Sequence, residues 1–143
     1  MDLTATRLRS FGLVSVILIG SCGVPGARSD RTDCALARIG RFEDVGTQDT
    51  RYVLTRTWNE QVEELPAIGL VSRSRVIWLD SCTYMLFGRT VLTGDQGPIS
   101  SLDTLKVSIV DAGPEGFEYE AVILSVDSKL NGRRIRGRQV LLK

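Results

Sequence analysis

A set of polar side chains between positions 56 and 84 has the residue types needed for ligand binding or acid–base chemistry. The set comprises Arg56, Gln61, Glu63, Asp80 and Tyr84. Carboxylates that meet in one cleft could serve as the acid and base of a small hydrolase. Acids at alternate strand positions are also common on a solvated face. A shared cleft would therefore indicate a site, whereas scatter over the surface would indicate an ordinary strand exterior.

The composition excludes several classes of chemistry. The chain has 143 residues, no histidine and a formal net charge of +1. Catalysis of the Ser-His-Asp or Cys-His type and histidine ligation of zinc are therefore impossible. The sequence contains neither a dinucleotide-binding nor a P-loop glycine motif. We expect no metal, no cofactor and no nucleic-acid partner, because a nearly neutral chain offers no long-range attraction to phosphates.

The first 21 residues have the pattern of a secretory signal peptide. Arg7 and Arg9 precede Phe11–Gly20, which is an almost continuous apolar stretch. This stretch is too short to span a bilayer as a helix, which needs about 20 residues. A basic region followed by an apolar stretch of this length predicts export.

The end of that stretch predicts how the exported chain is held. Ile19-Gly20-Ser21-Cys22 resembles the lipobox of bacterial lipoproteins, in which an aliphatic residue and two small residues precede an obligatory cysteine. The resemblance implies cleavage before Cys22 and acylation of that cysteine. Several acyl chains anchor a protein stably to a membrane. Plain cleavage near Ala27 is the alternative.

Residues 22–33 would then form the lipidated cysteine and a flexible tether, since turn formers dominate and no apolar period is present. Lipoproteins retained in the inner membrane commonly carry aspartate after the cysteine, and this chain has Gly23. The resemblance thus implies the outer membrane, with the domain facing the periplasm. Without residues 1–21 the chain keeps 16 basic and 16 acidic residues.

Two cysteines remain once Cys22 carries lipid. Cys34 and Cys82 would lie in an oxidising compartment, where a remaining pair usually forms a disulfide. A reactive thiol is the alternative, and it needs a site that stabilises the thiolate. We expect a structural disulfide.

The elements that must position these residues are predicted to be strands. The pattern favours an all-β fold in residues 34–143, a single domain whose antiparallel meander forms a small closed or half-closed barrel with at most one short helix. Ala35–Phe42 fits a first short strand, and Asn59–Leu65 fits a helical turn before Pro66. The main predicted strands are Arg51–Trp58, Val71–Leu79, Cys82–Leu92, Thr104–Val110, Phe117–Val126 and Ile135–Leu142.

The segment around Cys82 allows two local structures. In one continuous strand from Trp78 to Leu86, the side chains of Trp78, Cys82 and Tyr84 would share one face. Alternatively, Asp80-Ser81 forms a local turn or bulge, because both residue types favour turns.

The C-terminal strands allow a register to be predicted. Asn131-Gly132 is typical of a two-residue hairpin turn. Such a turn would place Ser125 opposite Arg138 and Asp127 opposite Arg136. We expect acids of one strand to pair with bases of the other. A basic strand for an anionic partner is the alternative.

A wider resemblance covers residues 34–143. Gly40-Arg41-Phe42, Gln61-x-Glu63 and Trp78-x-Asp80-x-Cys82-x-Tyr84 resemble the pattern of a family of small exported bacterial lipoproteins of unknown activity. Its members often carry the label "DNA topoisomerase IV". That label does not suit this chain, because topoisomerase subunits are several times longer and carry an ATPase fold or a catalytic tyrosine with metal carboxylates. The resemblance implies no activity.

Two functional classes follow from the sequence. The first is a membrane-anchored, non-enzymatic binding or structural module of the cell envelope, whose partner is an envelope protein or a small ligand. The second is a small carboxylate-dependent hydrolase of the envelope.

Overall fold

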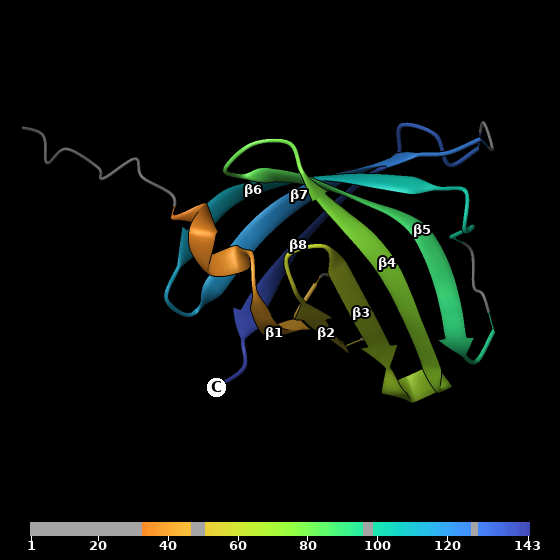
Figure 1. Cartoon of the computed structure of the whole chain (residues 1–143), viewed down its shortest axis with the longest axis horizontal. Helices are drawn as coiled ribbons and strands as arrows, with labels where there is room; N and C mark the ends of the chain where they lie inside the picture. Colours follow the sequence, from red (N-terminus) through yellow and green to blue (C-terminus); the bar gives the residue numbers. More distant parts are fainter. Residues whose placement is uncertain (1–32, 47–50, 96–98, 127–128) are drawn as a thin grey trace, which may run out of the picture.

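The chain folds into a closed antiparallel barrel in which each strand pairs with the next and β8 returns to β1. The computed structural model describes residues 33–46, 51–95, 99–126 and 129–143 (Figure 1). The predicted all-β meander is confirmed. Its strands are β1 (Gly40–Asp44), β2 (Tyr52–Arg56), β3 (Glu60–Leu65), β4 (Leu70–Trp78), β5 (Thr83–Thr93), β6 (Thr104–Gly113), β7 (Gly116–Leu124) and β8 (Arg134–Leu141).

Alternation of side chains fills the interior of the barrel. In β7 the buried residues are Phe117, Tyr119, Ala121 and Ile123, and the residues between them are more exposed. In β5 this alternation shifts at Gly88, whose φ of 60° suits a residue without a Cβ and which lies at an irregularity in the β4–β5 ladder. The shift turns Arg89 toward buried Ser72, so that a second arginine enters the barrel.

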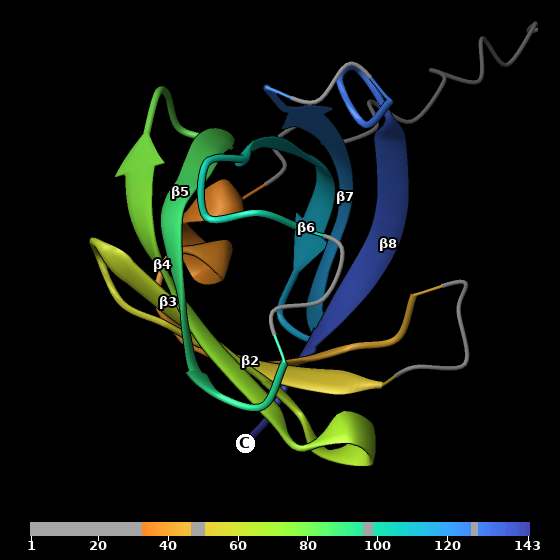
Figure 2. The same ribbon diagram turned by 90° about the vertical axis from the view of Figure 1, so that its right-hand side faces the viewer.

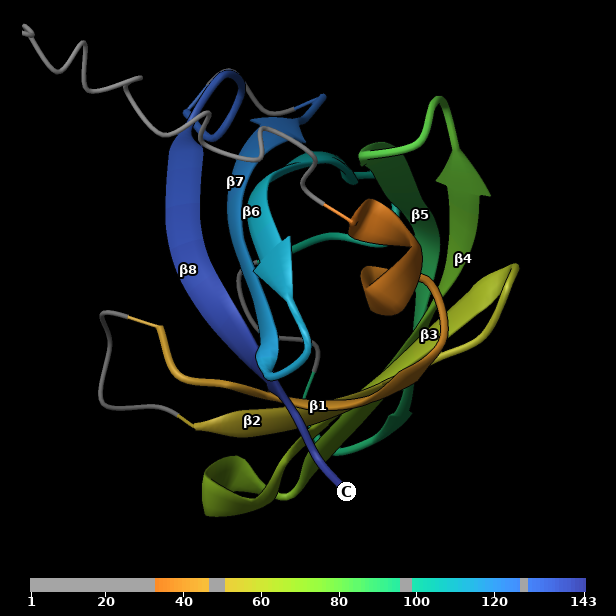
Figure 3. The ribbon, with the colours of Figure 1, turned by 90° about the vertical axis from the view of Figure 1, so that its left-hand side faces the viewer.

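One end of the barrel is closed by a 3₁₀ turn, η1 (Cys34–Ala37), which lies in the mouth between the strands (Figure 3). The predicted disulfide between Cys34 and Cys82 is confirmed, with the two Cα atoms 5.2 Å apart. It joins η1 to the turn between β4 and β5. At the opposite end residues 99–103, which precede β6, pass across the mouth (Figure 2). Among the described residues, no helix has the length and hydropathy to cross a membrane.

Two predicted elements differ from the structure. Residues 60–65 form β3 and not a helical turn, because Gln61 and Glu63 point inward and pair with β2. The only helical turn nearby is η2 (Pro66–Ile68), which begins at the proline. Ala35–Phe42 is divided between η1 and β1.

The chain turns at Asp80-Ser81, as the second of the two predicted structures requires. β4 ends at Trp78, and Trp78 faces Tyr84 across the ladder. The Asp80 carboxylate accepts a hydrogen bond of 2.8 Å from the Cys82 N–H, which closes the turn. The turn, one of the two structures that the sequence allows here, is therefore confirmed, and the continuous strand is not formed.

The predicted register of the C-terminal hairpin is also wrong. Arg138 pairs with Glu118 rather than with Ser125. Gly137 lies opposite Tyr119, and a Cβ there would come within 2.6 Å of the tyrosine hydroxyl oxygen. In the observed register Tyr119 packs over a residue without a Cβ, and Asn131-Gly132 lies within a longer loop. Asp127 is outside the described residues.

The predicted pairing of acids on one of these strands with bases on the other is confirmed, but between different residues. Arg136 forms an ion pair of 2.7 Å with Glu120, its partner in the ladder, and Arg134 lies 3.9 Å from the same carboxylate. The basic residues of β8 are thus partly neutralised by β7.

Candidate functional site

The centre of the barrel is occupied by a single arginine, Arg56 at the end of β2, which is 1% exposed. Its Nε donates to Gln61 at 2.7 Å and its Nη1 donates to the Ala37 carbonyl at 2.7 Å. Its Nη2 donates to the Tyr84 hydroxyl at 2.7 Å and to the Gln139 side-chain oxygen at 3.2 Å. Each of the three guanidinium nitrogens therefore has a partner from a different part of the barrel.

Aromatic rings surround the same guanidinium group. Its central carbon lies 4.4 Å from the ring centre of Tyr84, 5.5 Å from that of Phe117 and 5.6 Å from that of Phe42. A cation close to aromatic faces gains electrostatic energy from the ring quadrupoles. These contacts help to offset the cost of removing the charge of Arg56 from water.

The compensating carboxylates lie one glutamine away from Arg56 on either side. Gln61 accepts from Arg56 and donates to Glu63 at 2.6 Å. Gln139 accepts from Arg56 and donates to Asp44 at 3.1 Å. A glutamine suits both places because its amide accepts through oxygen and donates through nitrogen.

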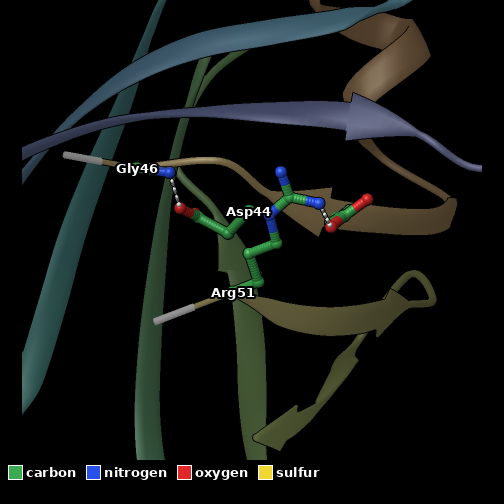
Figure 4. A network of polar contacts seen from close by, with 4 residues as sticks. Asp44, Gly46 and Arg51 are labelled. Atoms are coloured by element: carbon green, nitrogen blue, oxygen red, sulfur yellow. Dashed lines mark hydrogen bonds and ion pairs between the residues drawn. The ribbon is translucent and has the colours of Figure 1, made fainter. Parts of the chain in front are cut away.

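Asp44 anchors the second arm of this interior network. Its carboxylate accepts hydrogen bonds of 2.8 Å from the hydroxyls of Tyr52 and Tyr119. It also accepts one of 2.9 Å from the Gly46 N–H (Figure 4). Burial raises the pKa of both tyrosine hydroxyls, and nearby carboxylates raise these pKa values further. The two tyrosines therefore remain protonated donors, as Asp44 requires. Figure 4 also shows Arg51 beside a carboxylate, which is that of Glu43.

Glu63 borders a small cavity on the first arm. The cavity has a volume of about 30 Å³. It has room for one or two water molecules, whereas sites for small organic ligands measure about 300–1,000 Å³. Its lining comprises Glu63, Ser74, Leu86, Phe87, Arg89, Ile99, Asp103 and Leu105.

Burial raises the pKa of Glu63 above its ordinary value, although the Gln61 hydrogen bond and the charges of Arg89 and Arg56 act in the opposite direction. Folded Glu63 therefore keeps its proton at a pH where the unfolded chain has lost it. Its contribution to stability is greatest below the unfolded pKa and is lost as the pH rises through the folded pKa.

Replacing Glu63 by glutamine should remove this pH dependence. Unfolding free energies of wild type and Glu63→Gln, measured in urea from about pH 4 to about pH 8, should diverge in favour of the wild type on the acidic side. A difference that stays constant over this range would contradict the raised pKa of Glu63.

The structure brings together four of the five sequence-predicted site residues. Arg56, Gln61, Glu63 and Tyr84 form one hydrogen-bonded cluster inside the barrel. Asp80 lies elsewhere, in the exposed turn between β4 and β5, where the hydrogen bond from the Cys82 N–H lowers its pKa. It therefore cannot act together with Glu63.

The sequence analysis missed the other arm of the network. Asp44 and Gln139 are both 3% exposed, and they face each other in the β1–β8 ladder. The available signal was their spacing. Asp44 lies two positions from Phe42 and Gln139 two positions from Leu141, so each shares a strand face with an apolar residue. Both were overlooked because polar residues at such positions usually face solvent.

The described residues contain no group of three or more histidine, cysteine or acidic side chains placed to hold a metal ion.

A broader concavity of about 430 Å³ lies along β3, β4 and β5 at the irregularity beside Gly88, with Arg73 and Arg75 among its lining residues. Glu60 lies 3.9 Å from Arg73 in this groove.

Comparison with protein-family models, curated protein sequences and solved structures finds no match. The functional argument therefore depends on the sequence motifs and on the geometry of the barrel.

Proposed function

We propose that this chain is a non-enzymatic β-barrel module of the bacterial cell envelope, anchored to a membrane by lipid on Cys22. The observation that carries the non-enzymatic part is the filled interior. Arg56 has partners at all three of its guanidinium nitrogens, and the adjoining cavity measures about 30 Å³. A site of this kind has no room for an organic substrate and acts as internal structure.

The disulfide supports the proposed compartment. Cys34 and Cys82 are joined, and disulfides persist in secreted and periplasmic proteins but are rare in the cytosol. The lipobox-like Ile19–Cys22 and the adjacent Gly23 favour the outer membrane with the barrel facing the periplasm. The resemblance to the small exported lipoproteins agrees with this location. The partner in this proposal is an envelope protein bound at the outer surface of the barrel.

One observation favours the hydrolase as a second candidate. Glu63 has a raised pKa and borders the interior cavity, whose lining also includes Asp103. A carboxyl group with a raised pKa is suited to donate a proton. Asp103, however, already accepts 2.8 Å and 2.6 Å hydrogen bonds from the Ser100 N–H and the Ser125 hydroxyl. Hydrolysis would require the barrel to open, so we place this function second.

Replacing Cys22 by alanine should release the protein from membranes. The acyl chains attach to the thiol of Cys22, and a chain without them has no stable anchor. Fractionation of bacterial cells should find the wild type in the membrane pellet, whereas Cys22→Ala should leave that pellet, either as a soluble protein or by degradation.

Ser21→Ala provides the matched control, because it preserves a small residue before Cys22 and should leave the attachment unchanged. Membrane attachment of Cys22→Ala equal to that of the wild type would refute the proposed anchor.

A further inference from the structure

The end of the barrel that holds η1 carries a cluster of exposed apolar side chains. It also receives the N-terminal segment, since the described chain begins beside Cys34 (Figures 1 and 3). The side chains are 43% to 60% exposed. They are Leu36, Ile39, Trp58, Ile77 and Leu79, and we call them the apolar rim.

Arg38 joins the segments that contribute to this rim. Its guanidinium carbon lies 5.7 Å from the ring centre of Trp58 and 4.8 Å from that of Trp78. Its Nη2 donates to the carbonyls of Asp80 at 3.4 Å and Ser81 at 3.5 Å. Residues from η1, from the β2–β3 turn and from the β4–β5 turn are thereby held as one surface around a cation.

Two donors at the centre of this surface have no acceptor. Arg38 Nε and Trp78 Nε1 are buried and lack a hydrogen-bond partner among the described residues. Unsatisfied buried donors are uncommon in folded proteins. The exposed apolar rim around them, and not the two donors, is what is typical of a surface that meets a partner.

The length of chain before η1 identifies the partner. If the chain from Cys22 to Cys34 is the flexible tether that the sequence predicts, it would span roughly 20 Å root-mean-square. β5 alone has 11 residues and extends about 36 Å at the usual rise per residue. An anchor at Cys22 therefore holds the η1 end, rather than the opposite end, next to the lipid surface.

We propose that the apolar rim docks on the membrane that holds the lipid anchor, so that the barrel sits upright on its η1 end. Tryptophan is enriched where membranes meet water. Trp58 is the most exposed side chain of the rim, at 60%, and the guanidinium carbon of Arg38 lies 5.7 Å from its ring centre. The proposal rests on the proposed Cys22 anchor.

The opposite end also has exposed apolar residues, among them Ile68, Leu102 and Val126. They lie on three separate connections, and none of the three is a tryptophan. Docking through that end would require the tether to extend along the whole barrel. It is the competing orientation.

Fluorescence quenching by brominated lipid tests the orientation. The protein extracted from membranes is reconstituted into vesicles of phosphatidylethanolamine and phosphatidylglycerol, with or without bromine on the acyl chains. Emission is compared between the wild type and Trp58→Phe, so that the difference reports Trp58. The control places a tryptophan at the far end, as Leu102→Trp in the Trp58→Phe background.

We expect bromine to reduce the Trp58 emission roughly twofold, because interfacial side chains reach the acyl boundary, and to leave the tryptophan at 102 unchanged. Ile39→Asp with Leu79→Asp, both at exposed sites, should abolish the quenching of Trp58 while the protein still floats with the vesicles. Quenching at 102 that equals or exceeds quenching at 58 overturns the proposal, as does unquenched Trp58 in protein that floats. Protein that does not float at all refutes the Cys22 anchor as well, so the two failures are distinguishable.

Discussion

Replacement of Arg56 by methionine should lower the free energy of unfolding by about 3–5 kcal/mol, as expected when one partner of a buried charged network is removed. Methionine fills a similar volume but donates no hydrogen bond. Gln61, Gln139 and the Ala37 carbonyl would lose their donor, and the carboxyl groups joined to Arg56 through the two glutamines would lose a compensating positive charge. Urea denaturation followed by tryptophan fluorescence measures the loss.

An arginine on the outer surface provides the control for this experiment. Arg73 is half exposed and lies 3.9 Å from Glu60, a pair of the kind that contributes at most about 1 kcal/mol. Arg73→Met should therefore be nearly neutral. Arg56→Met with a stability equal to that of Arg73→Met would show that the interior network does not hold the barrel together.

Removal of the disulfide should have an effect of similar size. The chain-entropy model gives about 4 kcal/mol for a crosslink between residues 48 apart in sequence. The variant with Cys34→Ala and Cys82→Ala should unfold at a lower urea concentration with little change in the native spectrum. An unchanged midpoint would mean that η1 holds its place without the crosslink.

The two changes should not be additive. The disulfide holds η1 in the barrel mouth, and η1 ends at Ala37, whose carbonyl accepts from Arg56. In a variant without Arg56, the disulfide still fixes η1, but η1 no longer holds the interior network through the Ala37 carbonyl, so the disulfide contributes less to stability. The combined variant should therefore lose less stability than the two separate losses predict, because the sites share a contact.

Much of the fold was predictable because period-two alternation and turn residues specify strands locally. The disulfide was predictable because few cysteines are present. Register was not predictable: Asn131-Gly132 suggested a tight turn, but β7 pairs with β8 in a register that packs Tyr119 over Gly137. This contact joins two strands, so a local turn preference does not reveal it.

The interior network was predictable only in part, and the reason is again nonlocal. Arg56, Gln61 and Glu63 lie close together in sequence, so one hairpin brings them together. Asp44 and Gln139 meet only when β8 closes the barrel onto β1. Asp80 was misplaced because alternation was extended through a turn, where the period ends.

The network also changes the meaning of the polar residues singled out from the sequence. Types that suggest acid–base chemistry serve here to compensate one buried cation through two glutamines. Their hydrogen bonds are made within the protein, and the function proposed above therefore depends on the outer surface and the anchor rather than on the interior.

The mass of the N-terminal peptide tests the central claim most directly. Protein is taken from the membrane fraction of bacterial cells, cleaved with protease and examined by mass spectrometry. We predict that the mature chain begins at Cys22 and that this residue carries diacylglycerol. A mature chain that begins near Ser29 without lipid would contradict the account.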